Sequence, residues 1–182
     1  QSMNYRLCFY ILGFYCGETL VGIYSNAVSL SEAVMLFGSS LALVQYSSLS
    51  NNEDDSSSKQ FSWKMSKING IFTALALLVL CLLPSEVYSF IFGKGFEEIS
   101  QAIRILSIGV LPLSIASNFT QYFYAKGNFK ISTFASIIGL GVTIIAGLIL
   151  IPKYQLQGAA LAATLSYFTT FSIEFYFFVF RK

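Results

Sequence analysis

The sequence predicts an all-α, polytopic membrane protein built as a six-helix transmembrane bundle. Of its 182 residues, 55% are hydrophobic and only 11% are charged, whereas about a quarter of the residues are charged in an ordinary soluble domain. The apolar residues also collect in charge-free runs of about 18 to 22 residues, the length of a helix that crosses a bilayer. Composition and run length together exclude a typical soluble globular domain.

Six apolar segments account for the bundle. They are 7–17, 19–48, 68–85, 105–125, 131–152 and 154–173. The first has only about eleven apolar residues and is too short to span a bilayer, so we expect it to be truncated and preceded by the N-terminal part of a longer protein. The second carries Glu32 but is long enough for a tilted helix. The last four are uninterrupted spanning helices.

Two connecting segments are expected outside the bilayer. Residues 49–67 are rich in Ser, Asn and Asp, which predicts a solvated cytoplasmic loop. Residues 93–104 form an external segment, in which two glycines and the spacing of Phe96, Ile99 and Ile103 predict a short surface helix. The small residues of 158–163 predict a close contact between helices.

The basic residues predict the orientation, because cytoplasmic loops carry more Lys and Arg than external ones. With Arg6 set aside as membrane-embedded, the larger group is Lys59, Lys64, Lys67, Lys126, Lys130, Arg181 and Lys182, and the smaller group is Lys94, Arg104 and Lys153. We therefore expect the C-terminus to be cytoplasmic.

Residue usage excludes several classes of function. The formal net charge is only +2, and no basic patch matches a nucleic-acid backbone. The chain has no histidine, the usual general base near neutral pH and the commonest metal ligand. Cys8, Cys16 and Cys81 lie in or at the ends of apolar segments without metal-ligand or disulfide spacing. We expect no nucleic acid, no metal and no cofactor.

Charged side chains within apolar segments mark candidate sites, because hydrocarbon disfavours them. Arg6 and Glu32 each lie thirteen residues from a predicted external turn near Thr19, so both are expected about 20 Å from it. They could face a water-filled cavity, where Arg6 binds a phosphate or carboxylate and Glu32 pairs with it or carries a coupling ion. They could instead form a purely structural ion pair. Glu174 is expected to snorkel to the cytoplasmic interface.

Segment 105–125 concentrates polar side chains around Pro112, and Asn118, Gln121 and Tyr122 are its candidate binding residues. Asn118 and Gln121 are three residues apart and share a helix face. Hydrocarbon cannot satisfy such groups, so they must face a cavity or neighbouring helices. Sugar binding and interhelical hydrogen bonding at a proline kink are the two interpretations.

Several short motifs then resemble one family in their order and spacing. They are GIYSNA at 22–27, FGKGF at 92–96, and ILIPKY at 149–154 running into GAA at 158–160. Together they resemble the C-terminal half of bacterial oligosaccharide flippases, the polysaccharide biosynthesis or O-antigen translocase proteins of the multidrug/oligosaccharidyl-lipid/polysaccharide (MOP) exporter superfamily. The resemblance covers nearly the whole chain, and it departs near Gln45, where many members carry a proline.

This resemblance implies the second lobe of a two-lobe transporter with roughly twelve helices, whose N-terminal lobe is missing here. It implies a transporter rather than an enzyme, which moves polyprenyl-diphosphate-linked oligosaccharide repeat units across the bacterial inner membrane by alternating access. The glycan would serve surface polysaccharide such as the O-antigen of lipopolysaccharide. Membrane lipid, other polysaccharide assembly proteins and a coupling H⁺ or Na⁺, with Glu32 as its candidate ligand, are the implied partners.

Three other functions stay open. A MATE-like cation-coupled drug exporter would share the architecture but line its cavity with aromatic and acidic groups. A membrane-embedded glycan enzyme would need charged groups collected in a large external loop, whereas 93–104 is short. A membrane scaffold without transport would be favoured if Arg6 and Glu32 face each other with no cavity around them.

Overall fold

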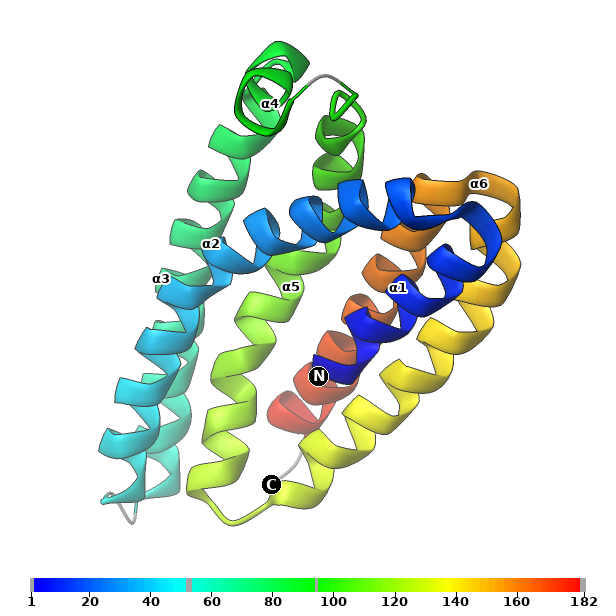
Figure 1. Ribbon diagram of the computed structural model, residues 1–182. Coiled ribbons are helices and arrows are strands. Elements are labelled where there is room, and N and C mark those ends of the chain that lie inside the picture. The colour runs from blue at the N-terminus through cyan, green and yellow to red at the C-terminus, as the bar shows by residue number, and fades with distance from the viewer. Residues whose placement is uncertain (1, 52–53, 94, 181–182) are drawn as a thin grey trace.

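The computed structural model describes residues 2–51, 54–93 and 95–180, which form helices and short turns without a strand among them. In chain order the helices are α1 (Ser2–Cys16), α2 (Glu18–Ser50), α3 (Asp55–Leu82), α4 (Ser85–Phe92), α5 (Ile99–Ala125) and α6 (Phe129–Phe180). Figure 1 shows the long helices lying alongside one another, with α4 at one end. The predicted all-helical fold is confirmed.

Helix α6 is a hairpin of two arms rather than one continuous rod. Gln155 has φ 47° and ψ −119°, which lie outside the helical region, and the chain reverses there between the yellow and orange parts of Figure 1. Pro152 precedes the reversal and has no amide hydrogen to donate to the helix. The arms 129–154 and 156–180 correspond to the predicted segments 131–152 and 154–173.

The long helices match the thickness of a bilayer. Helices α2, α3, α5 and α6 are each long and apolar enough to span it, while the apolar part of α1 runs only from Arg6 to Cys16. Because α6 contributes two arms, these helices account for all six predicted segments. The protein is therefore a multi-pass helical membrane protein.

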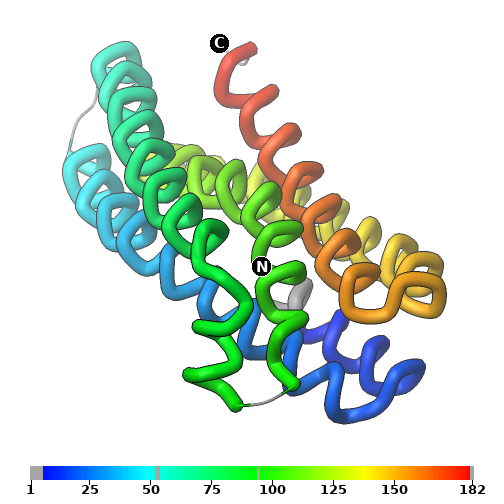
Figure 2. The backbone as a smooth tube through the Cα atoms, turned by 90° about the horizontal axis from the view of Figure 1, so that it is seen from above, coloured from blue at the N-terminus to red at the C-terminus, as the bar shows by residue number. Residues whose placement is uncertain are grey.

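Helix α5 occupies the centre of the bundle. It contacts α2, α3, α4 and α6, and Figure 2 shows it between α2 and α3 on one side and the arms of α6 on the other. Tyr88 of α4 folds that short helix back onto α3, because its hydroxyl donates to the Leu80 carbonyl at 2.6 Å. A residue change in α5 thus affects several interfaces at once.

The predicted solvated loop over 49–67 is wrong, since α3 already begins at Asp55. Asp54 caps this helix by accepting the backbone N–H groups of Ser56 and Ser57 at 3.1 and 3.3 Å. The Ser57 hydroxyl also donates to it, and these hydrogen bonds lower the pKa of Asp54. The serines that made the segment look like a loop include Ser58 and Ser62, which are buried.

The predicted surface helix over 93–104 is also wrong. The short helix is α4, which ends at Phe92 and is followed by Gly93 with φ 103°, and α5 begins at Ile99. Ile99 and Ile103 are buried in the core, so their spacing marks the first turns of α5. Lys94, Arg181 and Lys182, which entered the orientation count, lie outside the described residues.

Small residues allow close helix contacts, as predicted, and they do so both within α6 and between α5 and α6. Gly158, Ala159, Ala160, Ala162 and Ala163 of α6 are buried, and a Cβ atom added to Gly158 would meet the Leu150 and Ile151 backbone of the first arm. On α5, a Cβ atom added to Gly109 would lie 2.8 Å from Thr164 Cα. The Thr164 hydroxyl also donates to the Ile105 carbonyl at 3.0 Å. Backbone contact and a hydrogen bond together fix this helix pair.

We therefore expect Gly109→Ala to destabilise the protein by about 1–3 kcal/mol, because the added methyl group must push two backbones apart. The matched control is Gly141→Ala, where an added Cβ meets nothing within 4 Å. Thermal unfolding of the detergent-solubilised full-length protein measures both. Equal stability of the two variants would contradict the close α5–α6 contact.

Candidate functional site

Arg6 and Glu32, the predicted membrane charges, lie on neighbouring helices α1 and α2. The turn between them is at Gly17, with φ 85°, so Arg6 lies about 17 Å and Glu32 about 23 Å along its helix from the turn. Arg6 is exposed and Glu32 is half-buried. Their depths are similar rather than equal, and both side chains reach the surface of this chain.

The structure forms no ion pair between these two residues. The one ion pair among the described side chains joins Lys126 Nζ to Asp55 Oδ1 at 3.8 Å. The purely structural interpretation of Arg6 and Glu32 therefore has no contact to support it. Their role in a cavity stays a prediction.

Buried polar side chains line the junction of α2, α3 and α5, and we call this set the polar seam. Its members are Gln45, Ser62, Ser66, Asn69, Thr73, Ser114 and Asn118. Each is at most 2% exposed, although the surrounding helices are apolar. Groups buried this deeply need partners within the protein.

Asn69 is the centre of the seam. Its Nδ2 donates to the Ser114 carbonyl at 2.8 Å, and its Oδ1 accepts the Ser114 hydroxyl at 3.0 Å and the Thr73 hydroxyl at 3.2 Å. An added Cβ on Gly38 of α2 would lie 2.3 Å from Asn69 Oδ1. The absence of a side chain at Gly38 thus lets α2 approach the α3–α5 hydrogen bonds.

Gln45 extends the seam toward the α2–α3 connection. Its Nε2 donates to the Asn118 carbonyl at 2.9 Å and to the Ser62 hydroxyl at 3.0 Å. Gln45 therefore bonds α2 to both α3 and α5. In the family resemblance this is the position near which many members carry a proline, and here its amide has a structural use.

The three candidates on α5 lie in different surroundings. Asn118 is enclosed in the seam, and Gln121 is half-buried. The Tyr122 hydroxyl donates to Asp55 Oδ1 at 2.9 Å, beside Lys126. The structure therefore does not gather Asn118, Gln121 and Tyr122 with Arg6 and Glu32 into one site, and their binding roles stay predictions.

Glu174 is the ionisable residue that sequence reasoning misplaced. It is fully buried, and the Thr120 hydroxyl lies 2.8 and 2.9 Å from its two carboxyl oxygens. It does not snorkel, because α6 continues to Phe180 and packs this turn against α5. A lone glutamate within an aromatic-rich stretch was the available signal, and extending the predicted helix beyond 173 would have found it.

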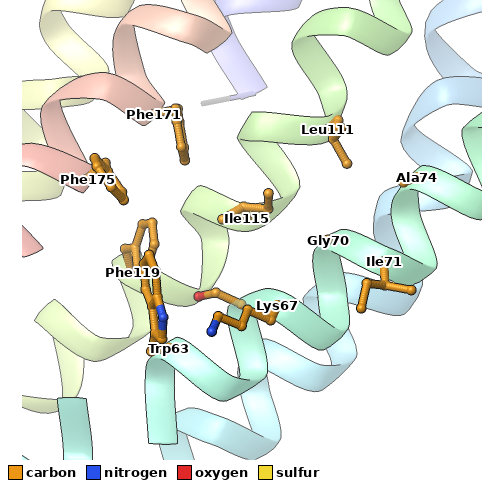
Figure 3. Close-up of a pocket in the computed structure, with 11 residues that line it drawn as sticks. Trp63, Lys67, Gly70, Ile71, Ala74, Leu111, Ile115, Phe119, Phe171 and Phe175 are labelled. Carbon is orange, nitrogen blue, oxygen red and sulfur yellow. The ribbon is translucent and has the colours of Figure 1, made fainter. Parts of the chain in front are cut away.

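A cavity of about 450 Å³ opens between α3, α5 and the second arm of α6 (Figure 3). Aromatic rings of Trp63, Phe119, Phe171 and Phe175 line it. Its remaining lining is also apolar except for Ser66 and Lys67, whose ammonium lies 5.5 Å from the Trp63 ring centre. The lining is thus mostly apolar and aromatic, with one cation beside Trp63.

Comparison with protein families matches residues 11–182 to the family described as lipid II flippase MurJ. The chain belongs to this family. The predicted resemblance to flippases of the MOP superfamily is thereby confirmed. No solved structure matches the chain significantly.

Curated relatives carry related names. The capsular polysaccharide biosynthesis protein CapF of Staphylococcus aureus is 29% identical over 97% of this chain and 46% of its own length. The probable low-salt glycan biosynthesis flippase Agl15 of Haloferax volcanii is 23% identical over 86% of this chain and 34% of its own length. An uncharacterized membrane protein of Methanocaldococcus jannaschii, MJ1068, is 26% identical over 91% and 34%. This chain thus spans less than half the length of these relatives.

Asn69→Leu tests the polar seam. We expect it to lower the free energy of unfolding by about 1–3 kcal/mol, because it leaves the buried Ser114 and Thr73 groups without their amide partner. Ser39→Ala is the control, since Ser39 is exposed and bonds only the Met35 carbonyl of its own helix. Denaturant unfolding of the full-length protein in detergent measures the difference. A seam variant as stable as the control would show that these bonds do not hold the helices together.

Proposed function

We propose that the full-length protein is a lipid-linked oligosaccharide flippase. It moves polyprenyl-diphosphate-linked repeat units from the cytoplasmic to the external leaflet of the bacterial inner membrane by alternating access. The observation that carries this proposal is the family match over residues 11–182. The names of CapF and Agl15 support a glycan substrate, and surface polysaccharide is its proposed destination.

Arg6 is the proposed ligand for the diphosphate. Its guanidinium is exposed on α1 and has no ion-pair partner among the described side chains. A guanidinium can hold phosphate oxygens with two parallel hydrogen bonds, which strengthens and orients the contact. Glu32, half-buried on α2, is the proposed ligand for a coupling H⁺ or Na⁺.

The orientation proposal places the C-terminus in the cytoplasm. Figure 1 shows the α2–α3 connection and the α5–α6 turn at one end of the bundle, opposite the α1–α2 turn and the α6 hairpin. Lys59, Lys64 and Lys126 lie toward the first end, and Arg104 and Lys153 toward the second. The count of basic residues assumes that successive connections lie on opposite sides of the membrane, and this arrangement supports that assumption.

Deleting the parent gene in its host tests the function directly. We expect lipid-linked oligosaccharide to accumulate in the cytoplasmic leaflet while surface polysaccharide is lost. Re-expression of the full-length protein should reverse both effects. Unchanged surface polysaccharide would refute the flippase proposal for that host and direct the next test to drug efflux.

Arg6→Ala should abolish most glycan export, whereas Arg6→Lys should retain part of it, because a point charge replaces only part of a bidentate contact. Export of surface polysaccharide by correctly inserted full-length variants is the measurement. Arg104→Ala is the control, since Arg104 is also exposed but lies on another helix, near the start of α5. Export by Arg6→Ala at the control level would remove Arg6 from the substrate site.

A further inference from the structure

Glu174 occupies an unusual place in the lobe. Among the described Asp, Glu, Lys and Arg side chains it is the only buried one, with 0% of its surface exposed. It lies on the second arm of α6 and faces Thr120 of α5. Because neighbouring helices of the same lobe enclose it, its burial does not depend on the rest of the protein.

The groups that face Glu174 bring no positive charge to it. Thr120 and Tyr124 lie on α5, and Ser132 lies on the first arm of α6. Lys126, at the end of α5, is paired with Asp55. Arg6 of α1, a helix that packs against α6, is exposed. An ionised Glu174 would thus be a buried charge without an opposite charge, which is strongly unfavourable in a bundle interior.

The two contacts to Thr120 bear on the protonation state of Glu174. A hydroxyl has one hydrogen, yet the Thr120 oxygen lies 2.8 and 2.9 Å from the two carboxyl oxygens. If Glu174 is ionised, its two oxygens share the hydrogen of the Thr120 hydroxyl in a three-centre hydrogen bond. If it holds a proton, its own O–H donates to Thr120 while the Thr120 hydroxyl donates to the other carboxyl oxygen. Thr120 can therefore partner both protonation states, and burial without a cation among the groups named above favours the neutral acid.

Glu174 is not part of a metal-ligand cluster. Among the described residues, no group of three or more His, Cys, Asp or Glu side chains could hold a metal ion. The separations between Thr120 and Glu174 are those of O–H···O hydrogen bonds. A proton is therefore the cation that we assign to this pair of side chains.

A small cavity lies beside Phe178, one helical turn along α6 from Glu174. Phe178 follows Glu174 by four residues, on the same helix face, and it lines a small cavity of about 90 Å³ with Asp55, Tyr122 and Lys126. These residues stand at the end of the bundle that we propose to be cytoplasmic. Access of water to the carboxyl group from this end of the bundle requires side chains between Glu174 and that cavity to move.

We propose that Glu174 is a reversible proton-binding site of the lobe, which exchanges its proton with cytoplasmic water and thereby controls the packing of α5 against α6. The proton passes from water to the carboxylate and returns to water, and no other bond changes. The neutral acid keeps the α5–α6 contact closed, whereas the ionised form requires water or helix separation. A role in transport rests on the proposed flippase function, but the site itself does not.

Infrared difference spectroscopy of the full-length protein in detergent tests the site without any substrate. A change in pH should produce a carboxylic-acid C=O signal that Glu174→Gln removes and that Glu97→Gln, an exposed control, retains. Thr120→Ser should preserve the signal, and Thr120→Val should change the pH at which it appears. A signal unaffected by Glu174→Gln and Thr120→Val would overturn the proposal.

Glycan flipping in proteoliposomes, measured across the same pH range, tests the link to transport. We expect the pH dependence of the wild-type rate to be lost in Glu174→Gln, which keeps the packing but cannot ionise. A folded Glu174→Gln protein with the wild-type pH profile would overturn the transport role. If the wild-type protein flips no glycan while the infrared signal behaves as expected, the flippase proposal fails and the proton site stands.

Discussion

The bilayer imposes one constraint on which the rest of this structure depends: polar groups on the spanning helices must find partners inside the protein. Helix α5 meets this demand on two sides. Ser114 and the Asn118 backbone bond to α3 and α2, while Thr120 bonds to Glu174 of α6. The helix with the most polar spanning sequence therefore lies at the centre of the bundle, where its side chains organise the helices around it.

Small residues make these bonds geometrically accessible. Hydrophobic burial drives little association between helices within lipid, so close van der Waals packing and hydrogen bonds carry the specificity. Gly38 allows α2 to approach Asn69, and Gly109 allows α5 to approach the Thr164 backbone. The glycines and the hydrogen bonds therefore act together, because a wider helix separation would break the bonds and leave buried polar atoms without partners.

Hydropathy predicted the fold class and the spans well, because long apolar runs reflect the bilayer directly. Hydropathy failed at polar side chains that are buried in the structure. Ser58 and Ser62 looked solvated but repeat every four residues along one buried helix face, and Glu174 looked interfacial because its burial arises from α5, far away in the sequence. Arg6 and Glu32 could be placed on adjacent helices from the sequence, but the contacts of their side chains depend on a turn that lies at Gly17 rather than Thr19.

The distribution of polar groups also limits how this lobe can meet a glycan. The seam side chains and Glu174 are enclosed by their own helices, and the 450 Å³ cavity is lined almost wholly by apolar groups. Neither offers a polar surface to a sugar. Exposed groups such as Arg6 are the proposed contacts of this chain with a glycan, and its relatives are more than twice as long. The interior polar groups instead join the helices to one another.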